Sequence, residues 1–309
     1  MFILTSEKTP EYAALLSYLP PPIRGLTMSL DTANLEEVRL RKQKPLSVCM
    51  NDGNYFVDCI GKVVRRTDTP YIVTQSDMDT ALELISRGSL YSLENEIKQG
   101  FITIAGGHRI GIVGKAVIKD AQVSYIKDIS GLNYRFAKQI LGAADSVIDS
   151  IRCGSSLKNT LIISPPQCGK TTLLRDIARI LSGMDYKISI IDERCEIAGM
   201  VDGISSYDVG INTDVLDSCP KADGMNLALR SMSPQVLITD EIGTAADIEA
   251  IQSALSCGVA VIASIHAASR ADLLIKPQFA PISALFERII TLSKRRGSGT
   301  IEEVYINAD

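Results

Sequence analysis

The stretch TLIISPPQCGKTTLLRDIAR, residues 160–179, decides the fold. An apolar run of strand-forming residues leads into a Pro-Pro turn, and Gly169-Lys170-Thr171 then opens a segment whose apolar residues recur at helical spacing. Glycine-lysine-threonine between a strand and a helix is the context typical of a phosphate-binding loop. The sequence therefore predicts a nucleotide site here; the alternative is a plain strand-turn-helix.

The chemistry expected of this loop follows from its residue types. Backbone N–H groups at the N-terminus of the helix would cradle the phosphates. The Lys170 ammonium would reach the β- and γ-phosphates of ATP, and the Thr171 hydroxyl would bind Mg²⁺. The nucleotide-binding residues that we expect are Ser164, Pro165, Pro166, Gln167, Cys168, Gly169, Lys170, Thr171 and Thr172.

Ser164 departs from the usual loop pattern, which has its first glycine at this position. Glycine is needed only where the backbone adopts angles that a Cβ atom resists. A residue before proline favours the β region, and a serine at the end of a strand before Pro165 satisfies that preference. We therefore expect a competent site, although its affinity can differ from that of a glycine-containing loop.

A second motif supplies the acidic groups that a phosphate-binding loop requires. In VLITDEIG, residues 236–243, four strand-forming residues precede Asp240 and Glu241. Ligands of open α/β sheets bind at the carboxyl ends of the strands. We expect Asp240 to hold Mg²⁺ and Glu241 to polarise the attacking water as general base. Taken alone, an Asp-Glu pair after a strand is also common as a helix cap.

Two further strands end in residues that can carry chemistry. KISIIDERCEIAG, residues 187–199, contains Glu193 and Glu196, and either could be the general base instead of Glu241. VIASIHA, residues 261–267, ends near His266, one of only two histidines in the chain. The alternatives are acidic residues that begin a helix and a histidine whose hydrogen bonds are satisfied in the core. With the loop present, we expect His266 to lie near the γ-phosphate.

The order of elements predicts two domains. Residues 1–140 read as a smaller α+β domain and linker, with a helix over 76–86 and strands around Gly106-Gly107. Residues 141–309 alternate short apolar strands with helix-sized segments, which indicates an α/β domain with a mainly parallel sheet. Residues 286–306 contain two β-rich runs about Gly-Ser-Gly and predict an antiparallel hairpin at the sheet edge.

Composition narrows the class of protein. The chain has 309 residues, of which 46% are hydrophobic and 22% are charged, a composition typical of globular proteins. Its apolar runs are too short to span a bilayer. Charged residues near the N-terminus disfavour a signal peptide, so we expect a cytoplasmic protein. The net charge of −4 disfavours a dedicated nucleic-acid binder. The seven scattered cysteines are expected to be reduced and mostly buried.

Together these motifs resemble the secretion-type hexameric P-loop ATPases that power type II and type IV secretion and pili. In that family they are the Walker A loop, the Asp box (IIDERCEI, 190–197), Walker B and the His box (ASIHA, 263–267). The resemblance implies a RecA-like ATPase domain that uses ATP and Mg²⁺ in a homo-hexameric ring. It also implies that arginines of the N-terminal domain contact the nucleotide, and Arg109 and Arg135 lie in the corresponding segments. For each of them a surface or interdomain ion pair is an equal alternative.

Residues 89–117, 165–179 and 286–305 resemble, more narrowly, a sporulation branch of the same family in endospore-forming bacteria. That resemblance implies a motor in the mother-cell cytoplasm, peripheral to the membrane, that energises a channel between mother cell and forespore through membrane-embedded protein partners. Two alternatives stay open. One is a RecA-like nucleic-acid translocase, and the other is an assembly component that binds nucleotide without turnover.

Overall fold

The computed structural model describes residues 10–28, 30, 34–86, 97, 100–119, 122–154, 156–275 and 280–307. The chain forms two compact units, and each is described here by itself. The N-terminal unit comprises residues 1–138 and 200–206, and the C-terminal unit comprises residues 139–199 and 207–309. The expected boundary after residue 140 lies close to this division, but the return of residues 200–206 to the N-terminal unit was not expected.

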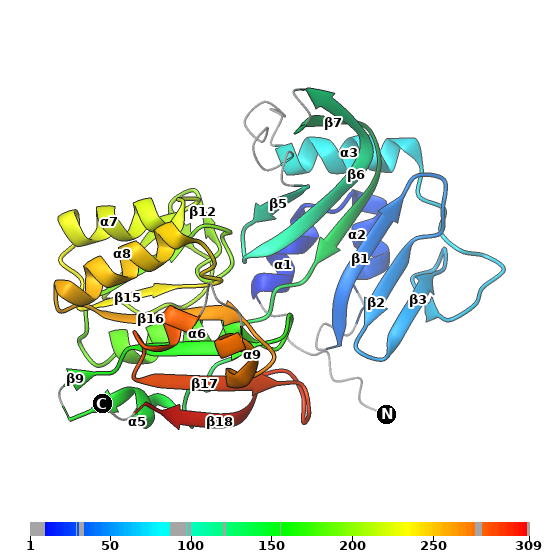
Figure 1. The fold of residues 1–309 in the computed structure, drawn as a ribbon. Helices are drawn as coiled ribbons and strands as arrows, with labels where there is room; N and C mark the ends of the chain where they lie inside the picture. Colours follow the sequence, from blue (N-terminus) through cyan, green and yellow to red (C-terminus); the bar gives the residue numbers. More distant parts are fainter. Residues whose placement is uncertain are drawn as a thin grey trace. The chain divides into compact units, whose positions relative to one another are not determined.

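The N-terminal unit is built on an antiparallel sheet, which has the order β4-β3-β2-β1-β7-β6-β5 among the described residues (Figure 1). The two-residue turn Asn51-Asp52 joins β2 to β3. The strands are β1 (Leu35–Arg41), β2 (Ser47–Met50), β3 (Gly53–Val57), β4 (Val63–Val64), β5 (Phe101–Ile104), β6 (His108–Lys119) and β7 (Gln122–Arg135), and a small ladder joins β12 (Met200–Val201) to β13 (Ile204–Ser205).

Only one face of this sheet carries the core. Side chains alternate along a strand, so Val38 and Leu40 of β1 point to the helices while Arg39 and Arg41 point away. Tyr134 of β7 is fully buried and donates a hydrogen bond to the Tyr18 carbonyl at 3.0 Å. The helices packed on the core face are α1 (Pro10–Ser17), α2 (Pro21–Thr27) and α3 (Gln75–Ser86). The opposite face is left without a helix among the described residues.

The C-terminal unit has a mostly parallel sheet with the order β14-β11-β15-β16-β10-β17-β18. Only the β17–β18 pair at its edge is antiparallel, which confirms the hairpin expected over residues 286–306. The strands are β10 (Thr160–Ser164), β11 (Ile188–Asp192), β14 (Thr213–Asp217), β15 (Val236–Thr239), β16 (Ala260–His266), β17 (Arg288–Ser293) and β18 (Thr300–Ile306), with a minor ladder of β8 (Arg152–Cys153) and β9 (Ser156–Leu157).

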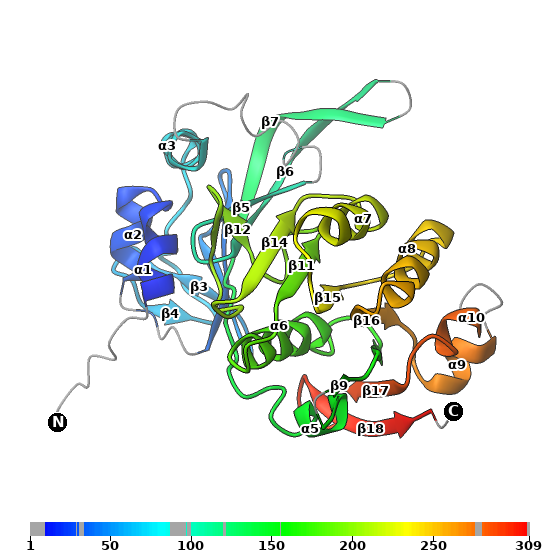
Figure 2. The same ribbon diagram turned by 90° about the vertical axis from the view of Figure 1, so that its left-hand side faces the viewer.

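Helices cover both faces of this parallel sheet, which explains why its central strands are apolar on both sides. Helices α7 and α8 lie on one face and α6 on the other (Figures 1 and 2). Leu161 and Ile163 of β10 pack toward α7 and α8, together with Met225 and Ile251. The helices are α5 (Ile148–Ile151), α6 (Lys170–Ser182), α7 (Lys221–Ser231), α8 (Ala245–Ser256), α9 (Arg270–Ile275) and α10 (Ala280–Ser283).

The expected α/β fold with a mainly parallel sheet is therefore confirmed, and the expectation for the cysteines is partly wrong. All seven are free thiols, but only Cys168 is buried, while Cys59, Cys153 and Cys257 are exposed. Many of them lie at strand ends and turns, where the backbone reaches the surface. Within the described part of the chain, no helix is both long and apolar enough to cross a membrane.

Candidate nucleotide site

The predicted loop connects the buried strand β10 to helix α6, which begins at Lys170. Gly169 caps the helix with φ of +89°, and Gln167 also has a positive φ of +58°. A Cβ atom on Gly169 would lie 3.1 Å from the Gly299 nitrogen, so both the angle and the space require glycine there. Gly169 is thus the glycine that this loop cannot exchange.

Ser164 needs no such freedom. It is the last residue of β10, pairs in register with His266 of β16, and is not among the residues with positive φ. Its side chain is fully buried, and its hydroxyl donates to the Pro165 carbonyl at 2.7 Å. The same oxygen accepts a hydrogen bond from Lys170 Nζ at 3.3 Å. The β conformation predicted for Ser164 is confirmed.

The turn between β17 and β18 packs against the loop from the sheet edge. The Gly299 N–H donates to the Cys168 carbonyl at 3.0 Å, and the Ser298 hydroxyl donates to the Gln167 carbonyl at 3.3 Å. Lys294 Nζ donates to the Gln167 side-chain oxygen at 3.2 Å. The basic run SKRRG, residues 293–297, therefore lies beside the loop, a contact that local sequence reasoning does not reveal.

Strand order brings the other predicted side chains to the same place. Strand β16 lies between β10 and β15, so the carboxyl ends of all three strands are neighbours at one end of the sheet. Lys170 Nζ lies 2.9 Å from His266 Nδ1, and His266 Nε2 lies 2.7 Å from Glu241 Oε1. An ammonium can only donate, so Nδ1 accepts and Nε2 carries the proton that is donated to Glu241. His266 thus connects the lysine of the loop to the proposed base.

Lys170 and Glu241 are held in unusual environments. Burial lowers the pKa of Lys170, and the nearby Glu241 carboxylate opposes that shift. Glu241 has a φ of +47°, which is uncommon for a residue with a side chain. Its N–H donates to the Ser264 hydroxyl of β16 at 3.0 Å, and its Oε2 forms an ion pair with Arg194. Strand β16 and Arg194 therefore fix both the backbone and the carboxylate of Glu241.

Asp240 fits the role of a magnesium ligand. Its Oδ2 lies 3.5 Å from the Thr171 hydroxyl, while its Oδ1 is buried and has no hydrogen-bond partner. Burial, followed by the negative charges of nearby acidic side chains such as Glu196, raises the pKa of Asp240 to about 7. A divalent cation would satisfy the unpartnered oxygen and offset this repulsion, and oxygen donors are the ligands that Mg²⁺ prefers.

The Asp box (residues 190–197) contains a buried structural carboxylate, Asp192, and two glutamates, Glu193 and Glu196, with different surroundings. The buried Asp192 carboxylate accepts the N–H groups of Glu196, Ile197 and Ala198 at 2.8–3.0 Å and so shapes the loop. Arg175 of α6 donates to the carbonyls of the same loop. Burial raises the pKa of Asp192. The Glu193 carboxylate forms an ion pair with Lys221, whereas the charge of Glu196 acts on Asp240 and Lys170.

Arg109 and Arg135 lie in the N-terminal unit, directly opposite each other on β6 and β7. The Arg109 guanidinium lies over the Phe101 ring, 4.4 Å from its centroid. Arg135 Nε lies 3.5 Å from Glu37, and its side chain is 58% exposed. Both arginines are thus on the sheet face that carries no helix, in a unit separate from the one that carries the loop.

Sequence reasoning missed Arg194, Lys221 and Gly299 as parts of the site. Arg194 lies inside the Asp box and pairs with Glu241, and Lys221 begins α7 and pairs with Glu193. Basic residues within an acidic motif could have signalled the first contact. The contact of Gly299 joins positions about 130 residues apart, as shown by the Ser298–Gln167 bond, and no local pattern encodes it.

Comparison with known proteins identifies the family of the chain and proteins of similar fold. Residues 15–308 match the family described as "Sporulation stage III, protein AA". The stage III sporulation protein AA of Bacillus subtilis (strain 168) is 40% identical over 278 residues, which cover 88% of this chain and 86% of that protein. The fold is similar to that of the Legionella pneumophila ATPase DotB, with 16% identity and a TM-score of 0.57 over 93% of this chain and 78% of DotB. It is also similar to the pilus retraction motor PilT, with 17% identity and a TM-score of 0.59 over 89% of this chain and 80% of PilT.

Proposed function

Because the chain belongs to the stage III sporulation protein AA family, we propose that it is a Mg²⁺-dependent ATPase that acts as a secretion-type motor in endospore formation. The observation that carries the proposal is the connected set of Lys170, His266 and Glu241 at the ends of three adjacent strands. A plain strand-turn-helix has no need of a buried lysine hydrogen-bonded to a histidine that in turn donates to a carboxylate.

The residues of the loop have distinct roles in this proposal. The amides from Gln167 to Thr172 and the Lys170 ammonium bind the phosphates of ATP. Thr171 and Asp240 hold Mg²⁺, which supplies charge neutralisation on the phosphate oxygens when bound. Ser164 fixes the end of β10 below the loop, where its hydroxyl already contacts Lys170. Phosphate oxygens would replace His266 as the partner of the lysine.

Glu241 is the general base that we favour. Its Oε1 accepts a hydrogen bond from His266 Nε2 and its Oε2 pairs with Arg194, so the carboxylate is held in one orientation and its remaining lone pairs can accept from a water molecule. Glu196 is the second candidate because its charge acts on Asp240 and Lys170, and Glu193, which pairs with Lys221, is the third. His266 would sense the γ-phosphate because it loses its contact with Lys170 when the lysine binds the phosphate oxygens. Arg109 and Arg135 would neutralise charge on the transferred phosphoryl group.

We further propose the assembly that this activity serves. Six copies would form a ring, and the ring would act in the mother-cell cytoplasm on membrane-embedded proteins of a channel complex joining mother cell and forespore. The family match supports the link to sporulation, and the fold shared with DotB and PilT supports the motor. The non-hydrolysing alternative is disfavoured because Lys170, Thr171, Asp240 and Glu241 are all in place.

The proposal is tested by complementation in an endospore-forming host that lacks its own copy of this protein. Lys170→Ala is expected to abolish heat-resistant spores because the phosphates lose their buried cation. Lys187→Ala is the matched control, because this lysine is exposed in the same unit and lies outside the site. Immunoblotting checks that both variants accumulate. Full spore formation with Lys170→Ala would refute the proposed function.

A further inference from the structure

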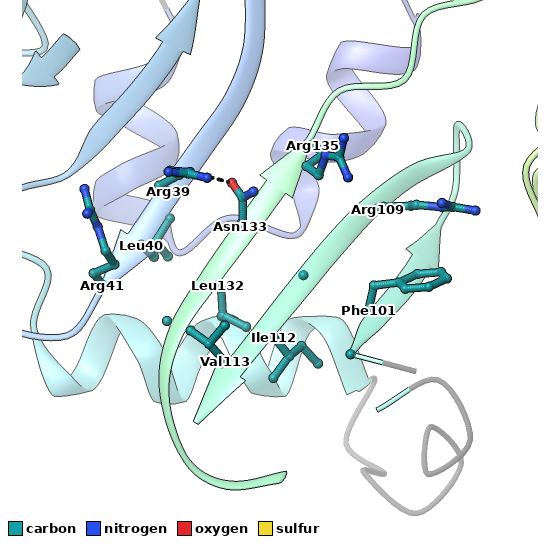
Figure 3. Close-up of a pocket in the computed structure, with 13 residues that line it drawn as sticks. Arg39, Leu40, Arg41, Phe101, Arg109, Ile112, Val113, Leu132, Asn133 and Arg135 are labelled. Atoms are coloured by element: carbon teal, nitrogen blue, oxygen red, sulfur yellow. Dashed lines mark hydrogen bonds between the residues drawn. The ribbon is translucent and has the colours of Figure 1, made fainter. Parts of the chain in front are cut away.

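The sheet face of the N-terminal unit that carries no helix contains a hollow of about 390 Å³ (Figure 3). Its floor includes Gly111 of β6 and Gly131 of β7, which have no side chains. Gly111 pairs with Asn133, and Gly131 pairs with Val113 and Arg41. Because longer side chains surround these glycines on adjacent strands, the pairing itself creates a depression in an otherwise flat sheet.

Positive charge surrounds the hollow. Arg39, Arg41, Arg109 and Arg135 line it. Glu37 is shared between two of them, at 2.8 Å from Arg39 and 3.5 Å from Arg135. Arg41 donates to the neutral Ser47 hydroxyl at 2.8 Å and has no carboxylate partner among the described residues. A chain with a net charge of −4 thus places four arginines around one hollow.

The arrangement of the arginines favours an extended anionic ligand over a single phosphate. Figure 3 shows Arg39 and Arg41 on one strand and Arg109 at the opposite side of the hollow, without convergence on one point. Farther along the β6–β7 hairpin, Lys115 lies directly opposite Lys127. Like charges directly opposite each other destabilise a strand pair, and a bound anion would relieve that cost.

Among the described residues that line the hollow, Phe101 is the one aromatic residue, and its surroundings argue for a peptide over a nucleic acid. Single strands of nucleic acid bind by stacking their bases on aromatic rings. The Phe101 ring is already covered by the Arg109 guanidinium. Carboxylates, in contrast, need only the planar fork of donors that each arginine presents.

We propose that this face binds an extended acidic segment of a protein partner, with its carboxylates on Arg39 and Arg41 and one of its apolar side chains in the hollow over Gly111. The inference rests on the proposed function in one respect: the partner is taken to be a component of the complex that the ATPase serves. Arg109 and Arg135 form the far side of the hollow and keep the nucleotide role proposed above.

The test uses the full chain and a fluorescein-labelled peptide in which glutamate alternates with leucine. Fluorescence anisotropy measures binding, and a peptide with glutamine in place of glutamate is the control ligand. Arg39→Gln/Arg41→Gln is expected to weaken binding about tenfold. Arg65→Gln/Arg66→Gln, which removes two exposed arginines elsewhere in the same unit, is expected to bind as the wild type does.

Gly111→Val tests the hollow separately from charge. A Cβ atom at this position would have its nearest neighbour, Asn133 Cβ, at 3.7 Å, which is ordinary contact, so the fold is expected to tolerate the side chain. Peptide binding is expected to weaken several-fold with unchanged salt dependence. Should thermal unfolding show that Gly111→Val is damaged, Gly111→Ala replaces it in the same assay.

Three results would overturn the proposal: no binding of the glutamate peptide, equal binding by Arg39→Gln/Arg41→Gln, or tighter binding of an oligothymidylate strand with the same dependence on Arg39 and Arg41. The last result would assign the face to nucleic acid. Lys170→Ala is expected to bind the peptide normally. Failure of the ATPase proposal and failure of the docking proposal are therefore distinguishable in the same set of proteins.

Discussion

At the scale of single residues, Ser164 shows that backbone conformation decides which positions of a phosphate loop need glycine. Ser164 ends a strand in an ordinary conformation, whereas Gly169 has a positive φ and touches Gly299. Proline at the next position already favours the β region for Ser164. A motif pattern that requires glycine at both positions is therefore stricter than the backbone demands. Only position 169 needs glycine for its φ and for the space beside Gly299.

Ser164→Gly is expected to change the ATP affinity by less than about threefold, because the loop conformation does not depend on glycine there. The variant should lose roughly 0.5–1 kcal/mol of unfolding free energy through greater freedom of the unfolded chain. Titration with a fluorescent ATP analogue and urea unfolding measure the two effects, and Ser164→Ala separates loss of the hydroxyl from gain of flexibility. ATP affinity in the wild type too weak to measure would contradict the competent site.

Asp240 predicts a pH dependence of stability in the absence of Mg²⁺. Its pKa is raised to about 7 in the folded chain, from an ordinary value near 3.8. The folded state thus binds the Asp240 proton more tightly than the unfolded state does. The contribution of Asp240 to the free energy of unfolding is therefore complete at low pH and is lost as the pH rises through about 7. The loss amounts to up to about 4 kcal/mol of unfolding free energy at about 1.4 kcal/mol per pKa unit.

Asp240→Asn is expected to remove this dependence, because an amide does not ionise. Urea unfolding at acidic and at mildly alkaline pH measures this difference. Relative to the wild type, the variant should have a higher free energy of unfolding at the higher pH than at the lower one. Mg²⁺ should stabilise the wild type more than the variant. Identical pH profiles for the two proteins would contradict the assignment of Asp240.

At the scale of elements, the sheet order explains the site. The strands, the loop and the acidic residues at strand ends could be predicted because period, residue type and turn residues are local signals. The position of β16 between β10 and β15, and with it the contact of His266 with Lys170 and Glu241, depends on topology. The ion pair of Arg194 with Glu241 likewise joins two loops, and the sequence of neither loop alone predicts it.

The contact between the β17–β18 turn and the loop gives a matched pair of variants. Gly169 and Gly297 both have positive φ, but only a Cβ atom at Gly169 would meet the backbone of Gly299. Alanine at either position should cost about 1–2 kcal/mol of stability. Only Gly169→Ala should raise the KM for ATP, by about tenfold or more, because it displaces the loop amides. Equal KM values for the two variants would show that the turn does not position the loop.

At the scale of the whole molecule, the two-unit organisation follows from the change of sequence rhythm near residue 140, but the return of residues 200–206 to the N-terminal unit does not. That segment is short, and its small β12–β13 ladder has no distinctive pattern. The basic face of the N-terminal sheet was also not predicted, because β1, which carries Arg39, is far in the sequence from the β6–β7 hairpin, which carries Arg109 and Arg135.

A ring in which Arg135 contacts nucleotide predicts a concentration-dependent enzyme. Specific ATPase activity should rise with protein concentration as rings assemble. Arg135→Ala should lower kcat on the order of 100-fold while ATP binding is retained, because its charge acts on the transition state. Arg65→Ala is the control in the same unit. Specific activity independent of concentration, together with normal turnover of Arg135→Ala, would contradict both the ring and the role of this arginine.

The most direct test of the central claim is steady-state phosphate release by the purified chain with ATP and Mg²⁺, for the wild type, Lys170→Ala and the control Lys187→Ala. We predict turnover by the wild type and by Lys187→Ala that is abolished by chelation of Mg²⁺, and no turnover above background by Lys170→Ala. Equal phosphate release by Lys170→Ala and the wild type, or none by the wild type at concentrations that support ring assembly, would contradict the account.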